Sequence, residues 1–68
     1  MSEPRNIELV RAQQDVESAR RIYAAQAGLI REIKAEGGDP RLAQSLLDTF
    51  QRTLKIYEDN FRKLAGKG

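Results

Sequence analysis

Acidic side chains are the first residues to consider for chemistry, because clustered carboxylates can bind metal ions or exchange protons. Eight of them lie within the chain's two long helical segments: Glu8, Asp15, Glu17, Glu32, Glu36, Asp48, Glu58 and Asp59. Helical bundles that bind two iron ions combine inward-facing glutamates with Glu-x-x-His pairs. The chain has no histidine and no cysteine, and its acids mostly avoid the apolar stripes. The sequence therefore predicts no metal site and no cofactor.

Four of these acids instead stand four residues before a basic residue. The pairs are Glu17–Arg21, Asp48–Arg52, Glu58–Arg62 and Asp59–Lys63. An acid placed one helical turn before a base supports an exposed helix by roughly 0.2–0.5 kcal/mol per pair. We therefore interpret these carboxylates as surface residues of helices.

Nucleophilic side chains offer no better basis for catalysis. Ser18 and Ser45 have no histidine to act as a base, and the lysines have no apolar pocket that would lower their pKa. The pair Gly37-Gly38 is not followed by the Gly-Lys-Ser/Thr of a phosphate-binding loop. The sequence predicts that the protein is not an enzyme, with no catalytic or cofactor-binding residues.

The elements that carry these residues are separated by a central string of turn residues, Glu36-Gly37-Gly38-Asp39-Pro40. Glycine ends helices in a left-handed conformation, aspartate accepts hydrogen bonds at the start of a helix, and proline suits the first helical position. So short a connection joins antiparallel neighbours. The predicted elements are a helix over about residues 5–36, a turn over 37–39 and a helix over about 40–65.

Each predicted helix carries a stripe of apolar residues at alternating spacings of three and four, which places them on one side of the helix. The first stripe is Leu9, Ala12, Val16, Ala19, Tyr23, Gln26, Ile30 and Ile33. The second stripe is Ala43, Leu47, Phe50, Leu54, Tyr57, Phe61 and Leu64. Folding the chain about Gly38 pairs Ala19 with Tyr57 and Gln26 with Phe50. We predict an all-α fold, an antiparallel two-helix hairpin over the single domain 1–68.

The small size of the chain limits the stability of a single hairpin. The chain has 68 residues, and natural domains this small usually rely on disulfides, a metal or oligomerisation. Without cysteine or histidine, oligomerisation is the remaining means of stabilisation. No apolar run approaches the roughly 20 residues needed to cross a bilayer, and the first six residues are polar. The sequence therefore predicts a soluble, cytoplasmic protein.

Several large apolar residues lie outside the two stripes and form the candidate interface. They are Ile7, Val10, Ile22, Leu29, Leu42, Leu46 and Ile56. They favour a homodimer of hairpins, which gives a four-helix bundle. Two alternatives stay open: the same residues are a docking surface for a different protein, or they are scattered surface residues of no function.

Basic residues raise nucleic-acid binding as the alternative function. The cations include Arg20, Arg21, Arg52, Lys55, Arg62, Lys63 and Lys67. Acids are interleaved with them, the net charge is only +2, and the aromatic residues lie in the stripes. A mixed-charge surface explains this pattern better than a phosphate-binding one. The sequence favours a small, self-associating protein that acts by protein–protein interaction in a structural, adaptor or regulatory role.

Residues 29–40 and 46–54, with Tyr57 and Arg62-Lys63-Leu64 after them, show the pattern "LI…L…G.D…A..LL..F..TL". Over residues 22–64 this pattern resembles a type of short proteobacterial helical-hairpin protein of unknown function. The resemblance implies a bacterial origin and implies no activity. In architecture the chain also resembles the plasmid repressor of primer, a helical hairpin that dimerises and binds paired RNA loops. That likeness concerns the fold alone, and no functional residue is transferred from it.

Overall fold

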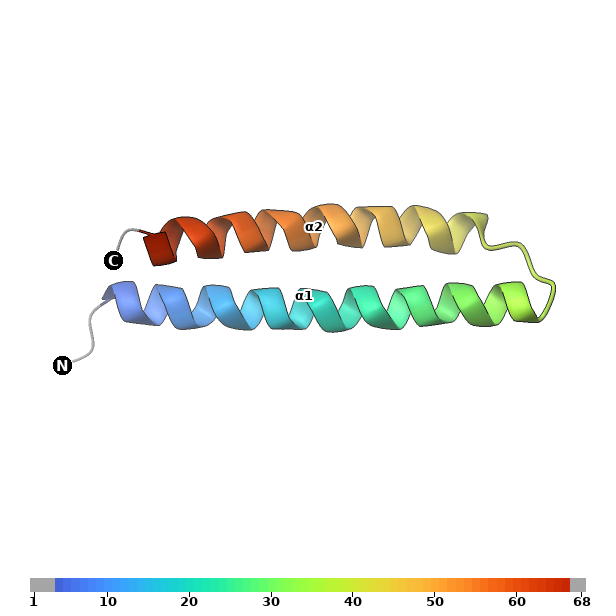
Figure 1. Ribbon diagram of the computed structural model, residues 1–68, viewed down its shortest axis with the longest axis horizontal. Coiled ribbons are helices and arrows are strands. Elements are labelled where there is room, and N and C mark those ends of the chain that lie inside the picture. The colour runs from blue at the N-terminus through green and yellow to red at the C-terminus, as the bar shows by residue number, and fades with distance from the viewer. Residues whose placement is uncertain (1–3, 67–68) are drawn as a thin grey trace.

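Two long α-helices, packed side by side in opposite directions, make up the protein (Figure 1). The computed structural model describes residues 4–66, and their side chains from residue 7. Helix α1 spans Pro4–Ala35 and helix α2 spans Arg41–Gly66. The molecule is elongated, with extents of 55 × 17 × 13 Å. The predicted all-α hairpin is confirmed, and each helix bound lies within one residue of the predicted one.

The core of the hairpin follows the two predicted stripes. The buried apolar residues are Ala12, Val16, Ala19, Ile30 and Ala43, all of them stripe members. The other stripe residues are half-buried, apart from Tyr57, which is 37% exposed. Small residues dominate this core because two helices alone meet along one line. No side chain in residues 7–66 is fully buried, and Ile30 is the largest of the buried ones.

The glycine pair ends α1 in the way that its sequence predicts. Gly37 adopts a left-handed conformation with φ of 79°, which costs a residue with a Cβ atom free energy. Its N–H donates to the carbonyl of Lys34 at 3.1 Å, and the Gly38 N–H donates to the carbonyl of Ile33 at 2.8 Å. These two bonds form a Schellman motif, which satisfies carbonyls that the end of the helix would leave free.

Asp39 and Arg41 form the start of α2. The backbone N–H of Arg41 donates to Oδ1 of Asp39 at 3.0 Å, which confirms the predicted capping role of this aspartate. The Arg41 guanidinium also donates to Oδ2 at 2.7 Å. The guanidinium and then the backbone N–H hold the pKa of Asp39 below its ordinary value, and the same carboxylate raises the pKa of Arg41. Helix α2 begins at Arg41, one residue after the predicted Pro40.

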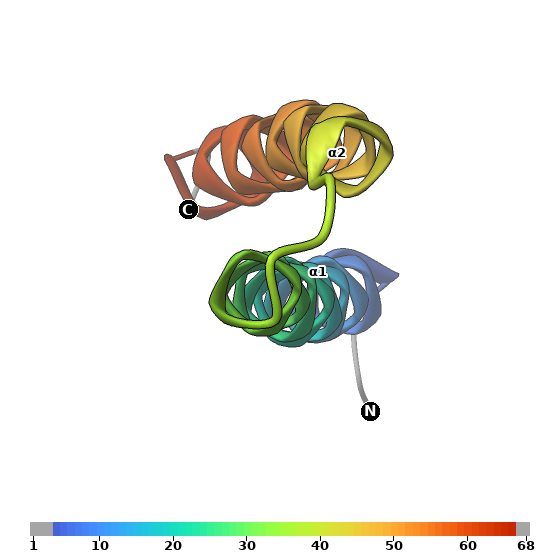
Figure 2. The ribbon, with the colours of Figure 1, turned by 90° about the vertical axis from the view of Figure 1, so that its right-hand side faces the viewer.

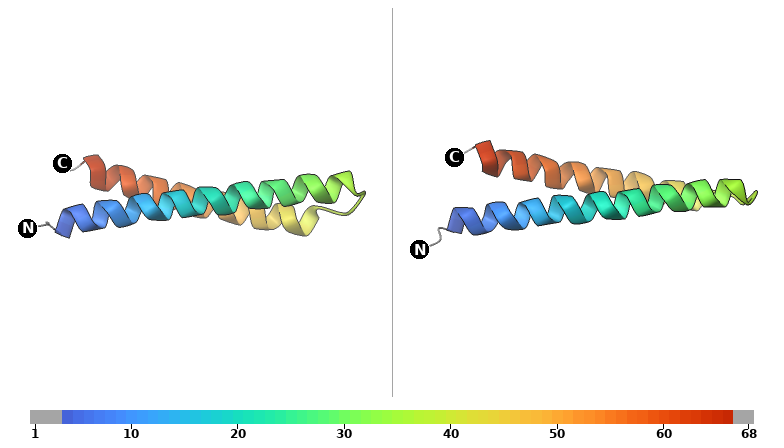
Figure 3. Two further views of the ribbon diagram at one scale, coloured as in Figure 1. Left: turned by 90° about the horizontal axis from the view of Figure 1, so that it is seen from below. Right: turned by 60° about the horizontal axis from the view of Figure 1, so that its bottom comes forward.

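The helices cross at a shallow angle along their length (Figures 2 and 3). A stripe that repeats every 3.5 residues drifts slowly around a helix of 3.6 residues per turn, so two such stripes stay in contact only if the helices incline toward each other. Gln26 joins the helices within this contact: its Nε2 donates to the carbonyl of Ala43 at 2.9 Å. The predicted pairing of Gln26 had been with Phe50, one heptad further along the same stripe.

Two kinds of feature are absent from the part of the chain that the structure describes. Neither helix is long and apolar enough to cross a membrane. No group of three or more acidic, histidine or cysteine side chains in that part lies close enough together to hold a metal ion.

Candidate interaction surface

All seven residues of the candidate interface are exposed in the hairpin. The exposed fractions are 53% for Ile7, 54% for Val10, 50% for Ile22, 45% for Leu29, 78% for Leu42, 46% for Leu46 and 65% for Ile56. A single exposed apolar residue is ordinary. Seven exposed apolar residues are many for so short a chain, and they form an interface only if they lie on the same side of the hairpin.

One of the seven, Ile22, lies at a groove between the two helices, which Asp15 and Ser18 of α1 also line. Ile22 of α1 lines it with Thr49, Phe50, Thr53 and Tyr57 of α2. The groove has a volume of about 280 Å³, and most of its lining area is apolar. Ile22 and the threonines therefore lie on the same side of the hairpin.

Heptad spacing places four more residues on that side, because residues seven apart point in nearly the same direction from a helix. Leu29 follows Ile22 by one heptad. Leu42 and Ile56 lie one heptad before and after Thr49. Leu46 lies one heptad before Thr53 and completes the set. We refer to these five candidates, Ile22, Leu29, Leu42, Leu46 and Ile56, as the apolar face.

Ile7 and Val10 lie elsewhere, so the structure separates them from the other candidates. Val10 is one heptad before Glu17, which lines a groove on the other side of the hairpin. Ile7 lies one heptad before Gln14 and two before Arg21, so the three side chains point in nearly the same direction. Gln14 and Arg21 are both exposed on the outer surface of α1. Figure 1 shows α1 extending past the end of α2 near these residues. The seven candidates do not form one surface.

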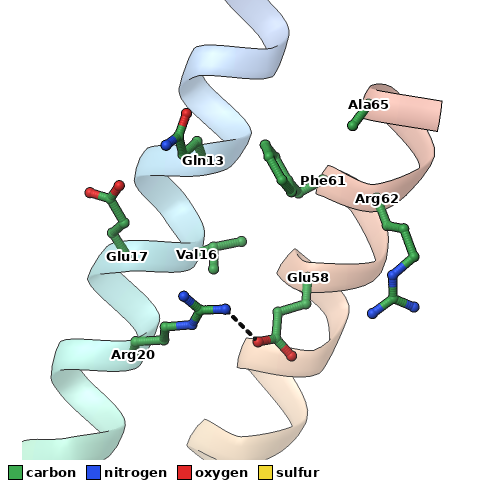
Figure 4. A pocket seen from close by; sticks show the side chains of 8 residues that line it. All are labelled: Gln13, Val16, Glu17, Arg20, Glu58, Phe61, Arg62 and Ala65. Carbon is green, nitrogen blue, oxygen red and sulfur yellow. Dashed lines mark hydrogen bonds and ion pairs between the residues drawn. The ribbon is translucent and has the colours of Figure 1, made fainter. Parts of the chain in front are cut away.

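The opposite side of the hairpin is charged. One groove there is lined by Glu17 and Arg20 of α1 and by Glu58 and Arg62 of α2 (Figure 4). A second groove shares Glu58 and Arg62 and adds Gln51, Lys55 and Asp59. We refer to the residues Glu17, Arg20, Gln51, Lys55, Glu58, Asp59 and Arg62 as the charged face.

One ion pair spans the two helices on this face. Nη2 of Arg20 lies 3.2 Å from Oε2 of Glu58, drawn as a dashed line in Figure 4. This pair is not among those predicted from the sequence, which all lie along one helix. The signal was present in the predicted register: Arg20 follows Ala19 and Glu58 follows Tyr57, and Ala19 was paired with Tyr57.

The four predicted ion pairs along single helices are not formed within residues 7–66. Arg62 pairs with Asp59 at 3.4 Å, three residues away, rather than with Glu58. Glu58 is engaged with Arg20 of the other helix. All of these side chains are at least one-third exposed, so each such pair contributes little, about 0–1 kcal/mol.

The groove of the apolar face also contains two aromatic residues that the sequence assigned to the core stripe. Phe50 is half-buried and Tyr57 is exposed, and both line the groove. They are one heptad apart, at the edge of the stripe that adjoins the apolar face. Aromatic residues are enriched at the centres of protein interfaces. They extend the apolar face into the line of contact between the helices.

Comparison of the chain with protein-family models, curated proteins and solved structures gave no match. The likeness to short proteobacterial hairpin proteins and to the repressor of primer stays a prediction from the sequence. The function has to be argued from the two faces of the hairpin.

Proposed function

We propose that this chain is a non-enzymatic interaction protein that associates with a second copy of itself through the apolar face. The product is a four-helix bundle in which the charged faces of both hairpins point outward. Its function is then structural, adaptor or regulatory, and is exercised by surface contacts with other proteins.

A single observation carries this proposal: within residues 7–66 the hairpin exposes more large apolar side chains than it buries. Val16 and Ile30 are the only buried apolar residues there that are larger than alanine. Eight large apolar side chains are exposed, and five of them make up the apolar face. A second hairpin packed on that face adds the core that one line of helix contact cannot provide.

The free energy that burial of these side chains would release supports association rather than chance exposure. Burying a leucine or isoleucine side chain completely is favourable by about 1.5–3 kcal/mol. The five side chains of the apolar face are 45–78% exposed, so each has about half or more of that stabilisation still to gain. A chain of this size without disulfides has few other sources of stability.

The proposal is tested by light scattering across a hundredfold dilution, with helicity followed by circular dichroism. We expect a mass near twice the chain mass of 7.7 kDa. The variant Leu42→Glu should dissociate at concentrations about tenfold higher or more, because every 1.4 kcal/mol of lost binding is tenfold in Kd. Leu42 is the most exposed of the five residues, so the hairpin itself should keep its helicity.

Val10→Glu is the matched control. Val10 is 54% exposed but lies on the opposite side of the hairpin, so the same charge there should leave association unchanged. A helical monomer at all concentrations would overturn self-association. A different protein would then be the occupant to seek for the apolar face.

A second candidate function, RNA or DNA binding, is favoured by the cations of the charged face, which would remain exposed in a bundle. Arg20, Lys55 and Arg62 line its grooves. Acids adjoin two of these cations, at 3.2 Å from Arg20 and 3.4 Å from Arg62. A steep fall in affinity with rising salt would support this function, because phosphate binding releases counterions. Undetectable or salt-independent binding would exclude it.

A further inference from the structure

We infer that the two copies pack antiparallel, with the turn of one hairpin directed toward the chain termini of the other, about a two-fold axis near Thr49 and Ala25. This inference rests on the proposed self-association and adds the arrangement. In it, α2 lies against α2 of the other copy, and α1 lies against the other α1. Each pair of facing residues is thus repeated by symmetry.

The apolar residues of α2 are symmetric about Thr49. Leu42 and Ile56 lie seven residues before and after it and are the two most exposed apolar side chains, at 78% and 65%. When two α2 helices are reversed about Thr49, each Leu42 faces the Ile56 of the other copy. Leu46 then faces Thr53, so a large residue meets a small one, which is how layers of helices interdigitate.

The residues of α1 repeat this symmetry. Ile22 and Leu29 lie at nearly equal distances on either side of Ala25, and their exposed fractions are 50% and 45%. Reversal about Ala25 brings Ile22 of one copy to Leu29 of the other. Ala25 itself meets its own copy, where a small side chain allows close approach of the two helices.

A single two-fold axis can relate both pairs of helices only if the centre of α2, at Thr49, and the centre of α1, at Ala25, lie at the same height along the hairpin. Ile22 lines one groove with Thr53, and Gln26 bonds to the carbonyl of Ala43. Ala25 lies between Ile22 and Gln26 in the chain. Its height therefore falls between those of residues 43 and 53, which is close to the centre of symmetry of α2.

The parallel arrangement, with both turns at the same end, places α1 of one copy along α2 of the other. Residues at the same height along the bundle then face each other, so Leu42 faces the partner's Glu32 and Ile56 faces the partner's Ser18. The two most exposed apolar side chains would be covered by a carboxylate and a hydroxyl. Covering apolar surface with a charged group loses free energy, because the charge must be desolvated. The antiparallel arrangement places these two side chains, Leu42 and Ile56, against each other instead.

Cysteine cross-linking distinguishes the two arrangements, because the chain contains no cysteine of its own. Residues on the axis meet their own copies, so we expect Thr49→Cys to form a covalent dimer with a disulfide oxidant or a short bis-maleimide. Leu42→Cys and Ile56→Cys should each react poorly alone and cross-link when the two variants are mixed. The matched control is Val10→Cys on the other side of the hairpin. Thr49→Cys should react at least about tenfold faster than this control, since held groups reach high effective molarities.

Each outcome separates the arrangement from self-association. Cross-linking of Thr49→Cys only to a mixed-in Ala25→Cys variant would overturn the antiparallel arrangement and leave the dimer intact, because these two columns oppose each other in the parallel form. A light-scattering mass that stays monomeric before any cross-linker is added would overturn both proposals. Mass and helicity of each cysteine variant in reducing buffer show beforehand whether it has retained the fold.

Discussion

The apolar face and the charged face are built from the same two helices, yet they differ in what they require of their surroundings. On the charged face, Arg20 and Glu58 join the helices across the contact line, and Arg62 pairs with Asp59. On the apolar face, Ile22 lines a groove with the neutral residues Thr49, Phe50, Thr53 and Tyr57 of α2, and Asp15 is the one charged residue in its lining. Charged groups are satisfied by each other and by water, whereas apolar groups gain only by leaving water.

This difference indicates how one short chain can encode both a fold and the proposed association surface. The core stripe positions supply the buried contacts between the two helices. The five residues of the apolar face lie on one side of the stripe, with Asp15 beside them toward the chain termini, and the residues of the charged face lie on the other side. A helix with so wide an apolar surface is typical of a bundle rather than of an isolated pair. The proposed association surface and the charged face thus lie on opposite sides of the hairpin.

The largest difference between the two faces is expected when the same cation is placed on each. Leu46→Lys puts a charge into the proposed interface and should raise the dimer Kd by at least about tenfold, because it removes a leucine worth 1.5–3 kcal/mol when buried. Gln51→Lys adds the charge to the charged face, where Lys55 and Arg62 already lie in water, and should leave the Kd unchanged. Sedimentation velocity across dilution measures both. Equal effects of the two variants would contradict the assignment of the faces.

A smaller effect is expected at the turn, which determines which stripe positions oppose each other. Gly37→Ala should destabilise the protein by about 1 kcal/mol, because Gly37 has φ of 79° and alanine is strained there. Gly28→Ala is the control within α1. Its Cβ would meet only the Arg31 side chain, at 3.8 Å, so it should stabilise by up to about 1 kcal/mol. Urea unfolding at fixed protein concentration reports both values. Destabilisation by both variants would contradict this account.

The smallest effect is expected on the charged face. Arg20→Gln removes the pair with Glu58, and because the Arg20 side chain is 63% exposed the loss of stability should be about 0.5 kcal/mol or less. The loss should shrink further in high salt, which screens exposed charges. Thermal unfolding at low and high salt measures it, with Glu58→Gln and the double variant completing the cycle. A coupling above 1 kcal/mol would show that this pair is a structural anchor.

The sequence predicted the hairpin because each of its signals is local. The glycine pair ends α1, Asp39 caps α2, and the stripe residues that the pattern selected supply every apolar side chain that is buried in residues 7–66. The exposure of the seven residues outside the stripes was also predictable from the sequence, since side chains beside a stripe point away from the line of contact between the helices. Bounds of helices were correct to one residue for the same reason.

Contacts between the helices were not determined in this way. Gln26 bonds to the Ala43 carbonyl and Glu58 pairs with Arg20 of the other helix, because side chains several atoms long choose among partners within reach only once the helices have crossed at a given height. Val10, in contrast, is separated from the apolar face by its position around α1 alone, one heptad before Glu17. The order of residues in the chain thus determined the bounds and the apolar stripe of each helix. The tertiary structure determined which residues of the two helices lie on the same side of the hairpin, because this depends on how the two slowly drifting stripes incline toward each other.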